Sequence, residues 1–321
     1  MANRSAVAAN TLQKKTGFAA FWTKFKRNWQ LHLMMLLPVA YYFIFHYVPL
    51  FGLQIAFRDF KPRAGIWNSE WVGLKNFMDF FAYYKWSEIV WNTMAISLYS
   101  LIVGFPIPII LALVLHINKY KVVKKLAQNI SDIPHFISTV VMVGILNQVL
   151  NPVTGLLGAF QNYFGIVNYT DIRASEDAFR HLYVWSGIWQ TMGWSTILYV
   201  SALSAVSEEL HEAAKIDGAS RWRRVLSVDL PAIMPTIAIR LILRSSSILS
   251  VGYEKVYLMQ NSLNMDKSEV ISTYVYKYGL GRNNLGYGSA VGMMNSVINT
   301  SMLLLVNWIT NRLSDNEVGL F

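Results

Sequence analysis

Long apolar stretches alternate with short polar segments along this chain. A bilayer core of about 30 Å requires about 20 mostly apolar residues in each helix that crosses it. Six stretches meet that length, and none of them contains Asp or Glu: 32–57, 90–117, 133–151, 182–206, 231–251 and 287–311. The pattern predicts an all-α, polytopic membrane protein with six transmembrane helices.

Glycine and proline interrupt the second of these predicted spans. Gly104, Pro106 and Pro108 lie within it, and proline removes backbone hydrogen-bond donors from a helix. In a membrane, neighbouring protein must then satisfy the freed carbonyl groups. We therefore expect a loosened second helix that packs inside the bundle.

Composition and charge placement support a membrane location. The chain is 54% hydrophobic and 14% charged, whereas a soluble domain carries roughly 25% charged residues. Its net charge of +10 is concentrated in the tail 1–31 and in the predicted loop 118–131. An excess of Lys and Arg marks cytoplasmic segments. The charge therefore predicts lipid contact rather than a nucleic-acid partner, with both termini in the cytoplasm.

The predicted cytoplasmic loop 207–231 has the sequence of two short helices joined by a turn. Ser207 can cap the first helix, and Gly218 can end it in a left-handed conformation. Ser220 can cap the second helix. Four residues of the first helix share one face, and two of them are small enough for a partner to approach closely: Leu210, Ala213, Ala214 and Asp217.

The segment from Glu212 to Pro231 resembles the EAA motif of ABC-importer permeases. The motif consists of Glu-Ala-Ala, then Asp-Gly-Ala, then apolar positions, then Leu-Pro. The residues that fill it here are Glu212, Ala213, Ala214, Asp217, Gly218, Ala219, Val225, Val228, Leu230 and Pro231. The resemblance extends over most of 91–311, which matches the transmembrane core of that family.

Membership of this family would imply the type I ABC importer permease fold in a bacterial cytoplasmic (inner) membrane. The loop would be a coupling helix that seats on an ATPase, with Gly218 forming its turn and Glu212 and Asp217 orienting it. This chain lacks a Gly-Lys dipeptide and hence a phosphate-binding loop, so ATP and Mg²⁺ would bind the ATPase. The implied partners are a second permease in a heterodimer, two ATP-binding subunits and an extracytoplasmic solute-binding protein.

The same resemblance divides the chain into four parts. They are a basic cytoplasmic tail (1–31), a first transmembrane helix with an outer loop (32–90), the permease core (91–311) and a short cytoplasmic tail (312–321). Three further stretches resemble the carbohydrate branch of the family, in particular permeases of alginate and pectin-fragment (rhamnogalacturonan) importers: 37–62, 71–77 and 270–276. They imply an oligosaccharide or polysaccharide substrate.

Arg240 and Arg244 are the candidate substrate ligands. They lie one turn apart in the fifth predicted span, and a charge within a span indicates a functional site by default. Guanidinium groups bind carboxylates through two hydrogen bonds, which would suit a uronate-containing sugar. Alternatively, Arg240 extends to the membrane surface, or both residues pair with acids of a sister subunit.

Two further pairs are weaker candidates. Trp185 and Trp189 could stack on sugar rings, although an interfacial aromatic belt explains them equally well. Asn295 and Asn299 could bind substrate, although such amides more often bond between helices.

Other function classes find less support. The six histidines show no metal-ligand spacing along the chain, and no catalytic motif or cysteine is present. An ion-coupled secondary sugar carrier would usually place acidic residues within its spans. A polytopic membrane enzyme would require an acidic metal-binding signature, and a plain membrane anchor would leave the alanine face of the loop without a partner.

Overall fold

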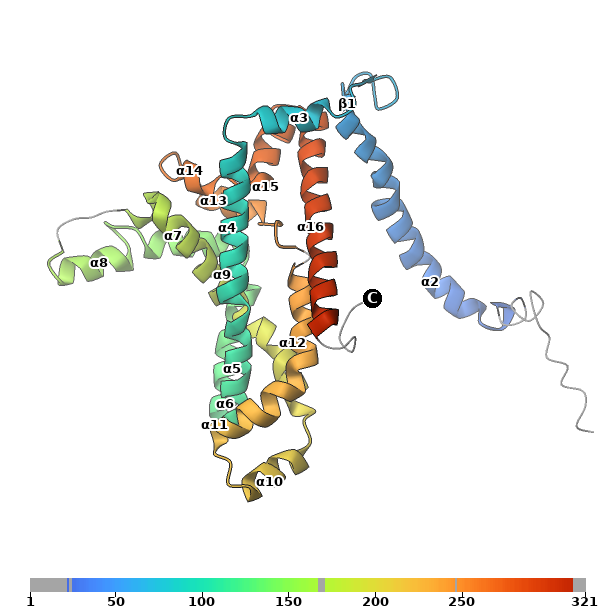
Figure 1. Ribbon diagram of the computed structural model, residues 1–321. Coiled ribbons are helices and arrows are strands. Elements are labelled where there is room, and N and C mark those ends of the chain that lie inside the picture. The colour runs from blue at the N-terminus through green and yellow to red at the C-terminus, as the bar shows by residue number, and fades with distance from the viewer. Residues whose placement is uncertain (1–21, 23–24, 167–170, 246, 314–321) are drawn as a thin grey trace, which may run out of the picture. The chain divides into compact units, whose positions relative to one another are not determined.

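The computed structural model describes residues 22, 25–166, 171–245 and 247–313, and the chain divides into two units, Met1–Gln54 and Ile55–Phe321 (Figure 1). Most of the predicted tail 1–31 and nearly all of the predicted tail 312–321 lie outside the described residues. The first unit is a helical run: α2 (Trp29–Tyr42), the π-helix η1 (Phe43–Tyr47) and the first part of the 3₁₀-helix η2 (Val48–Phe57). No side chain of α2 or η1 is buried. A helix that is apolar on all sides needs an apolar environment, as expected of the first predicted span.

The second unit begins with a two-stranded antiparallel hairpin, in which Arg58 pairs with Trp71, and continues as helices. Its elements are β1 (Arg58–Asp59), β2 (Glu70–Trp71), α3 (Lys75–Ala82), α4 (Trp86–Gly104), α5 (Pro106–Ile117), α6 (Lys121–Asp132), η3 (Ile133–Phe136), α7 (Thr139–Val149), α8 (Leu156–Tyr163), η4 (Ile172–Ala174), α9 (Glu176–Ser204), α10 (Glu208–Ile216), α11 (Arg221–Arg224), η5 (Val225–Asp229), α12 (Leu230–Ser245), α13 (Tyr253–Met259), α14 (Met265–Ser268), α15 (Ile271–Tyr274), η6 (Val275–Gly281) and α16 (Leu285–Leu313).

The second predicted span is interrupted at the expected place. Its two helices, α4 and α5, are separated by Phe105 alone. Pro106 and Pro108 cannot donate to the carbonyls one turn before them. The hydroxyl of Thr196 in α9 donates to the Pro108 carbonyl at 3.2 Å, so a neighbouring helix contacts the loosened segment, and the satisfaction of the freed carbonyls stays a prediction.

The expected loop 118–131 is largely helical. Residues 121–132 form α6, and the chain bends by 104° between the run Lys121–Phe136 and α7. The basic residues of this segment lie on the first turns of a helix, where hydropathy alone indicates a loop. Gly193 of α9 permits close packing here, because a Cβ atom at that position would lie 2.2 Å from the Ser131 carbonyl oxygen.

Among the residues that the structure describes, four helical runs are long and apolar enough to cross a membrane, and the bent pair would make a fifth. The four are Trp29–Phe57, Trp86–Ile117, Arg221–Ser245 and Leu285–Arg312. The predicted span 182–206 corresponds to α9, which has 29 residues. The described helices are therefore compatible with six spans, and the number six stays a prediction.

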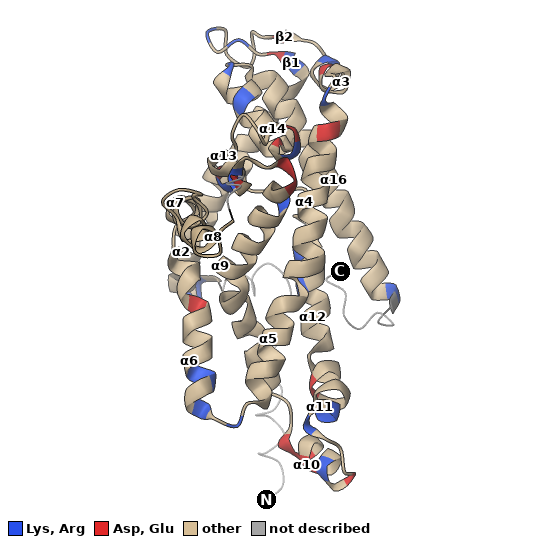
Figure 2. Cartoon of the chain, turned by 90° about the vertical axis from the view of Figure 1, so that its left-hand side faces the viewer, with Lys and Arg blue, Asp and Glu red and all other residues tan. Residues whose placement is uncertain are grey.

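One buried cluster joins α5, α9 and α12 near the end of the bundle that carries α10. Tyr199 and Leu203 of α9 contact Ile109 and Ala112 of α5 and Ile233 of α12. Other clusters pack α4, α7, α9 and α13, and the helices near α3 and α16. Within this second unit, Figure 2 shows charged residues mainly toward the two ends, with few along the helices between them.

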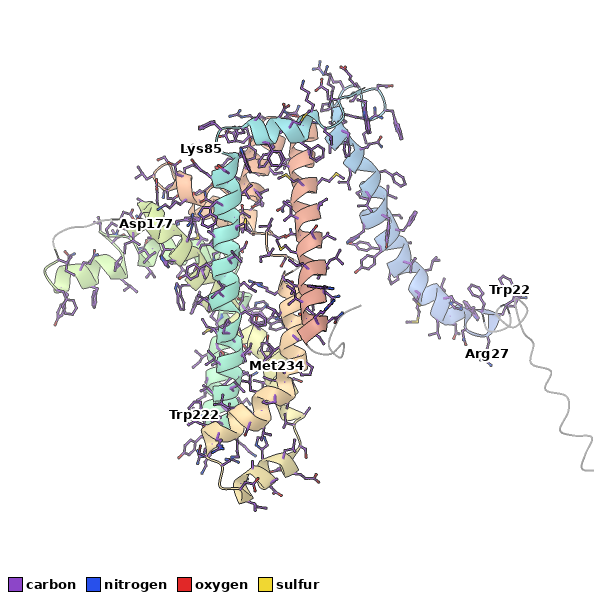
Figure 3. The ribbon with its side chains drawn as sticks, in the orientation of Figure 1. Trp22, Arg27, Lys85, Asp177, Trp222 and Met234 are labelled. Atoms are coloured by element: carbon purple, nitrogen blue, oxygen red, sulfur yellow. The ribbon has the colours of Figure 1, made fainter. Side chains whose placement is uncertain are left out.

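Ion pairs tie several elements together at the end opposite α10. Lys85, just before α4, pairs with Asp266 of α14 at 2.6 Å. Lys267 of α14 pairs with Asp177 in the first turn of α9. Figure 3 labels Lys85 and Asp177 at this end, and Trp222 of α11 at the other.

A prediction for stability follows from Gly288, where α16 contacts η6. A Cβ atom at Gly288 would lie 2.7 Å from the Gly279 Cα atom, whereas one at Gly292, a turn later, would meet nothing within 4 Å. Gly288→Ala should therefore destabilise the protein by about 1–3 kcal/mol through overpacking. Gly292→Ala is the matched control. It should stabilise the protein by up to about 1 kcal/mol, because alanine has a higher helix propensity than glycine. Thermal unfolding that ranks the two variants in the opposite order would contradict the contact.

Candidate functional site

The predicted helix–turn–helix of the coupling segment is confirmed in detail. The Ser207 hydroxyl oxygen caps α10 by accepting from the Glu209 N–H at 3.2 Å. Gly218 ends that helix with a φ of +76°, a conformation that favours glycine. The Ser220 hydroxyl oxygen accepts from the Arg223 N–H at 3.3 Å and caps α11.

The face of α10 with the two alanines is open. Leu210, Ala213 and Asp217 are exposed and Ala214 is half-buried. Nearby, Ile216 is 86% exposed and Trp222 is 65% exposed. Apolar side chains gathered at a chain reversal mark an interaction surface. The roles of Glu212, Asp217, Gly218 and Ala219 in ATPase coupling stay predictions.

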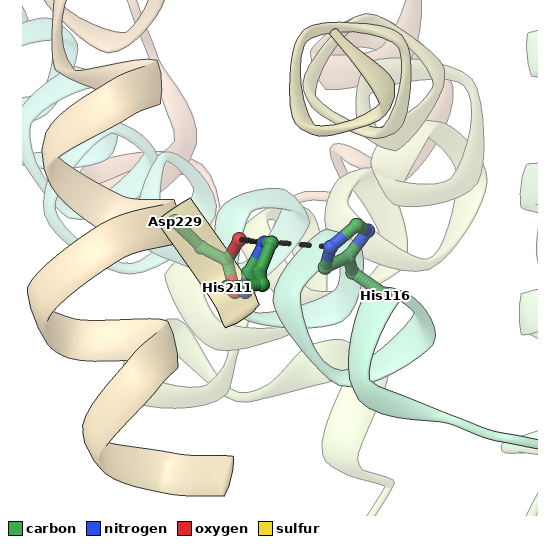
Figure 4. Close-up of side chains that lie close together, drawn as sticks. All are labelled: His116, His211 and Asp229. Carbon is green, nitrogen blue, oxygen red and sulfur yellow. Dashed lines mark ion pairs between the residues drawn. The ribbon is translucent and has the colours of Figure 1, made fainter. Parts of the chain in front are cut away.

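A cluster of three side chains lies between α10 and the helices of the bundle (Figure 4). His211 of α10 places its Nε2 atom 3.1 Å from Oδ1 of Asp229, which is 2% exposed in η5. His116, near the end of α5, places its Nε2 atom 3.6 Å from the same oxygen. Spacing along the sequence did not reveal this cluster, because its members come from three separate elements.

The predicted arginines line two adjoining cavities. Arg244 lines both, one of about 400 Å³ and one of about 250 Å³, and Arg240 lines the smaller one beside Tyr199. Neither arginine forms an ion pair within the described parts of the chain. The fold thus supplies the internal cavity that the substrate hypothesis requires, and the ligand role itself stays a prediction.

Lys255 of α13 lines the larger cavity together with Arg244, and sequence analysis missed it. This residue is 9% exposed, its Nζ atom donates to the Tyr183 carbonyl at 2.7 Å, and the ammonium lies over the Tyr183 ring. The sequence placed it in an outer loop, because the fifth span was predicted to continue to residue 251. In fact α12 ends at Ser245, and the chain turns back toward α9.

The ionisation of Lys255 makes stability depend on pH. Burial lowers the pKa of Lys255 to about 7, whereas an unfolded lysine has a pKa of about 10.4. Between these values the unfolded chain binds more protons, so stability rises with pH from about 7 to about 10. The melting temperature of the purified protein should follow this rise, and Lys255→Met should flatten it. Parallel profiles for the two proteins would contradict the assignment.

The aromatic and amide candidates lie in different surroundings. Trp185 and Trp189 do not line either cavity, and Trp185 donates to the Tyr99 hydroxyl at 3.0 Å. Trp194, which stacks on His135, lines the larger cavity instead. Asn299 accepts from the Leu249 N–H at 2.8 Å. This bond joins two segments of the chain, which agrees with the structural role given above as the alternative to substrate binding. The Asn295 side-chain oxygen is buried without a hydrogen bond.

A helical membrane bundle with an open amphipathic helix at one end and unpaired cations in an internal cavity has the features of a membrane transport subunit. Residues 104–315 match the family described as "Binding-protein-dependent transport system inner membrane component". Because this match covers more than half of the chain, the protein belongs to that family. It is a permease subunit of an ABC importer, which works with an ATPase and a solute-binding protein.

Two relatives from Bacillus subtilis (strain 168) are similar over nearly the whole chain. Protein LplB is 38% identical over 300 residues, or 92% of each chain. The polygalacturonan/rhamnogalacturonan transport system permease protein YteP is 37% identical over 290 residues, covering 90% of this chain and 89% of that protein.

A chain in the crystal structure of a bacterial alginate ABC transporter in complex with alginate pentasaccharide-bound periplasmic protein is similar in fold. The TM-score is 0.84 at 32% identity, covering 93% of this chain and 99% of that one. The predicted permease fold and family are therefore confirmed. Family membership also excludes the alternatives of a secondary carrier and a membrane enzyme.

Proposed function

We propose that this permease imports acidic oligosaccharides or polysaccharide fragments that contain uronate units. One observation carries the proposal: two arginines and a buried lysine line the two cavities, and no carboxylate is among the described residues that line them. The arginines, Arg240 and Arg244, stay charged at neutral pH, whereas the charge of the lysine, Lys255, depends on pH. A guanidinium binds a carboxylate through paired hydrogen bonds, and burial strengthens such contacts.

Other lining groups suit the rest of a sugar. Ser247, Gln190 and Thr191 can bond hydroxyl groups, and the Trp194 indole offers a flat face for a pyranose ring. The names of the relatives agree with this class, since one concerns polygalacturonan and rhamnogalacturonan and a solved transporter binds alginate through its periplasmic protein. All three of these polymers are acidic.

The proposed assembly contains this chain, a second permease, two ATP-binding subunits and an external binding protein. Both termini and α10 face the cytoplasm, in line with the basic residues near the α10 end. ATP and Mg²⁺ bind only the ATPase subunits. Closure of the ATPase subunits pushes α10. The movement passes through α11 and η5 to α12, and the cavity opens toward the loaded binding protein. Hydrolysis then returns the cavity to the inside.

Uptake into vesicles that contain the complete transporter tests the substrate class. The substrates are a uronate oligosaccharide and the same oligosaccharide with its carboxyl groups reduced to alcohols, so that only the charge differs. We expect ATP-dependent uptake of the acidic form at a rate at least about tenfold higher, since a charge-assisted hydrogen bond contributes about 1.5–3 kcal/mol. Equal uptake of both forms would overturn the acidic substrate class.

A further inference from the structure

The cluster of His116, His211 and Asp229 has the ligand set of a metal site. It offers two imidazole nitrogens and one carboxylate oxygen, all within 4.8 Å of one another. Each ligand comes from a different element, α5, α10 or η5. The site lies away from both cavities that hold the arginines, and the transport function does not account for its composition.

Two of the three separations fit tetrahedral coordination, and all three ligand atoms lie within 4.8 Å of one another. Zn²⁺ binds histidine nitrogen and carboxylate oxygen at about 2.0–2.2 Å, and a tetrahedron of that size places its ligand atoms about 3.3–3.5 Å apart. The two imidazole nitrogens lie 3.1 and 3.6 Å from Oδ1 of Asp229. A small shift of side chains would therefore place one ion at bonding distance from all three atoms.

The ligand atoms lack other partners that would explain their burial. Asp229 is 2% exposed, yet its Oδ1 atom has no hydrogen bond of acceptable geometry, and neither does the Nε2 atom of His211. Buried polar atoms are almost always satisfied, and the two histidines compensate the buried carboxylate of Asp229 only when they carry an added proton. A cation between these atoms would satisfy both at once.

The surroundings limit which ion fits. A cavity of about 430 Å³ opens onto the three ligands and leaves room for a fourth, such as water. The same cavity is lined by Lys119, Lys215, Arg221 and Arg224, with Glu208 as a further acid. These positive charges lower the affinity for any cation, so strong bonds from the imidazole nitrogens must offset them. Imidazole suits Zn²⁺, Ni²⁺ and Cu²⁺, whereas Mg²⁺ and Ca²⁺ prefer oxygen ligands.

We propose that His116, His211 and Asp229 bind a transition-metal dication of the Zn²⁺ class. The bound ion joins the α10 helix to the ends of α5 and η5, and so fixes the angle at which α10 leaves the bundle. Binding itself does not depend on the proposed substrate, so failure of one proposal leaves the other standing.

Cobalt titration of the complete transporter tests the site. The transporter is purified through a tag without histidine, treated with a chelator and kept free of nucleotide. Co²⁺ is then added while the visible absorption of tetrahedral Co²⁺ is recorded, and Zn²⁺ is used to displace it. We expect one such site for each copy of this chain. Both His211→Gln and His116→Gln should weaken binding by at least about tenfold.

His135→Gln is the matched control, since His135 stacks on Trp194 outside the cluster, and it should bind Co²⁺ like the unaltered chain. Size-exclusion chromatography shows whether each variant remains assembled. If assembled His211→Gln and His116→Gln transporters retain full affinity, or the unaltered transporter lacks a tetrahedral Co²⁺ signal, the proposal is wrong.

Discussion

Gly218→Pro is expected to reduce substrate-stimulated ATP hydrolysis by the assembled transporter by at least about tenfold. Gly218 has a φ of +76°, and its N–H donates to the Lys215 carbonyl at 3.0 Å. Proline fixes φ near −65° and removes the donor, at a cost of about 3 kcal/mol or more. The turn between α10 and α11 must therefore rearrange, and the open face of α10 would lose the orientation in which we propose that it meets the ATPase.

Gly165→Pro provides a control with the same backbone defect. Gly165 follows α8, has a φ of +68°, and donates to the Asn162 carbonyl at 3.1 Å. This variant should lose local order without a comparable loss of stimulated hydrolysis. If both variants, or neither, lose stimulation while the complex stays assembled, the turn at Gly218 has no special part in coupling.

Arg244→Ala is expected to lower the uptake of acidic oligosaccharides by about 10- to 100-fold, since a hydrogen bond to a charged group contributes about 1.5–3 kcal/mol. Arg244 lines both cavities and lacks an ionic partner among the described residues, so its loss removes a positive charge without freeing a buried acid. The effect should appear mainly as a raised KM for the acidic substrate. Uptake of the reduced, neutral oligosaccharide should change little.

Two further variants separate charge from geometry. Arg244→Lys retains the charge but not the paired donors, and should recover only part of the uptake. Arg282→Ala is the matched control, because Arg282 lies over the Tyr278 ring and lines neither cavity. Equal losses for acidic and neutral substrates in Arg244→Ala would indicate that this arginine supports the fold.

Local signals in the sequence predicted the local structure well. Ser207, Gly218 and Ser220 lie where caps and a turn were expected, because capping depends on residues only a few positions apart. The break near Gly104 was predictable for the same reason. The helix Lys121–Asp132 was missed because a sliding average of hydropathy cannot follow a helix that starts with lysines and then bends.

The sites were predictable only in part. Arg240 and Arg244 were identifiable because charge within an apolar stretch is conspicuous. Lys255 was not, because its burial depends on the chain turning back after Ser245 toward Tyr183. The cluster around Asp229 likewise depends on tertiary packing, which brings together residues 95 positions apart, from His116 to His211.

The break between α4 and α5 also affects the chemistry of the cavities. Gly104 lines both of them, and its carbonyl would normally accept a bond from residue 108, which is a proline. Pro108 thus removes the usual donor to a carbonyl of a residue that lines the cavities, beside two guanidinium groups, those of Arg240 and Arg244, that can only donate. Sugar hydroxyls both donate and accept, so a ligand passing this wall meets partners for each role. The proline that weakens this helix would thereby add a hydrogen-bond acceptor to the proposed substrate path.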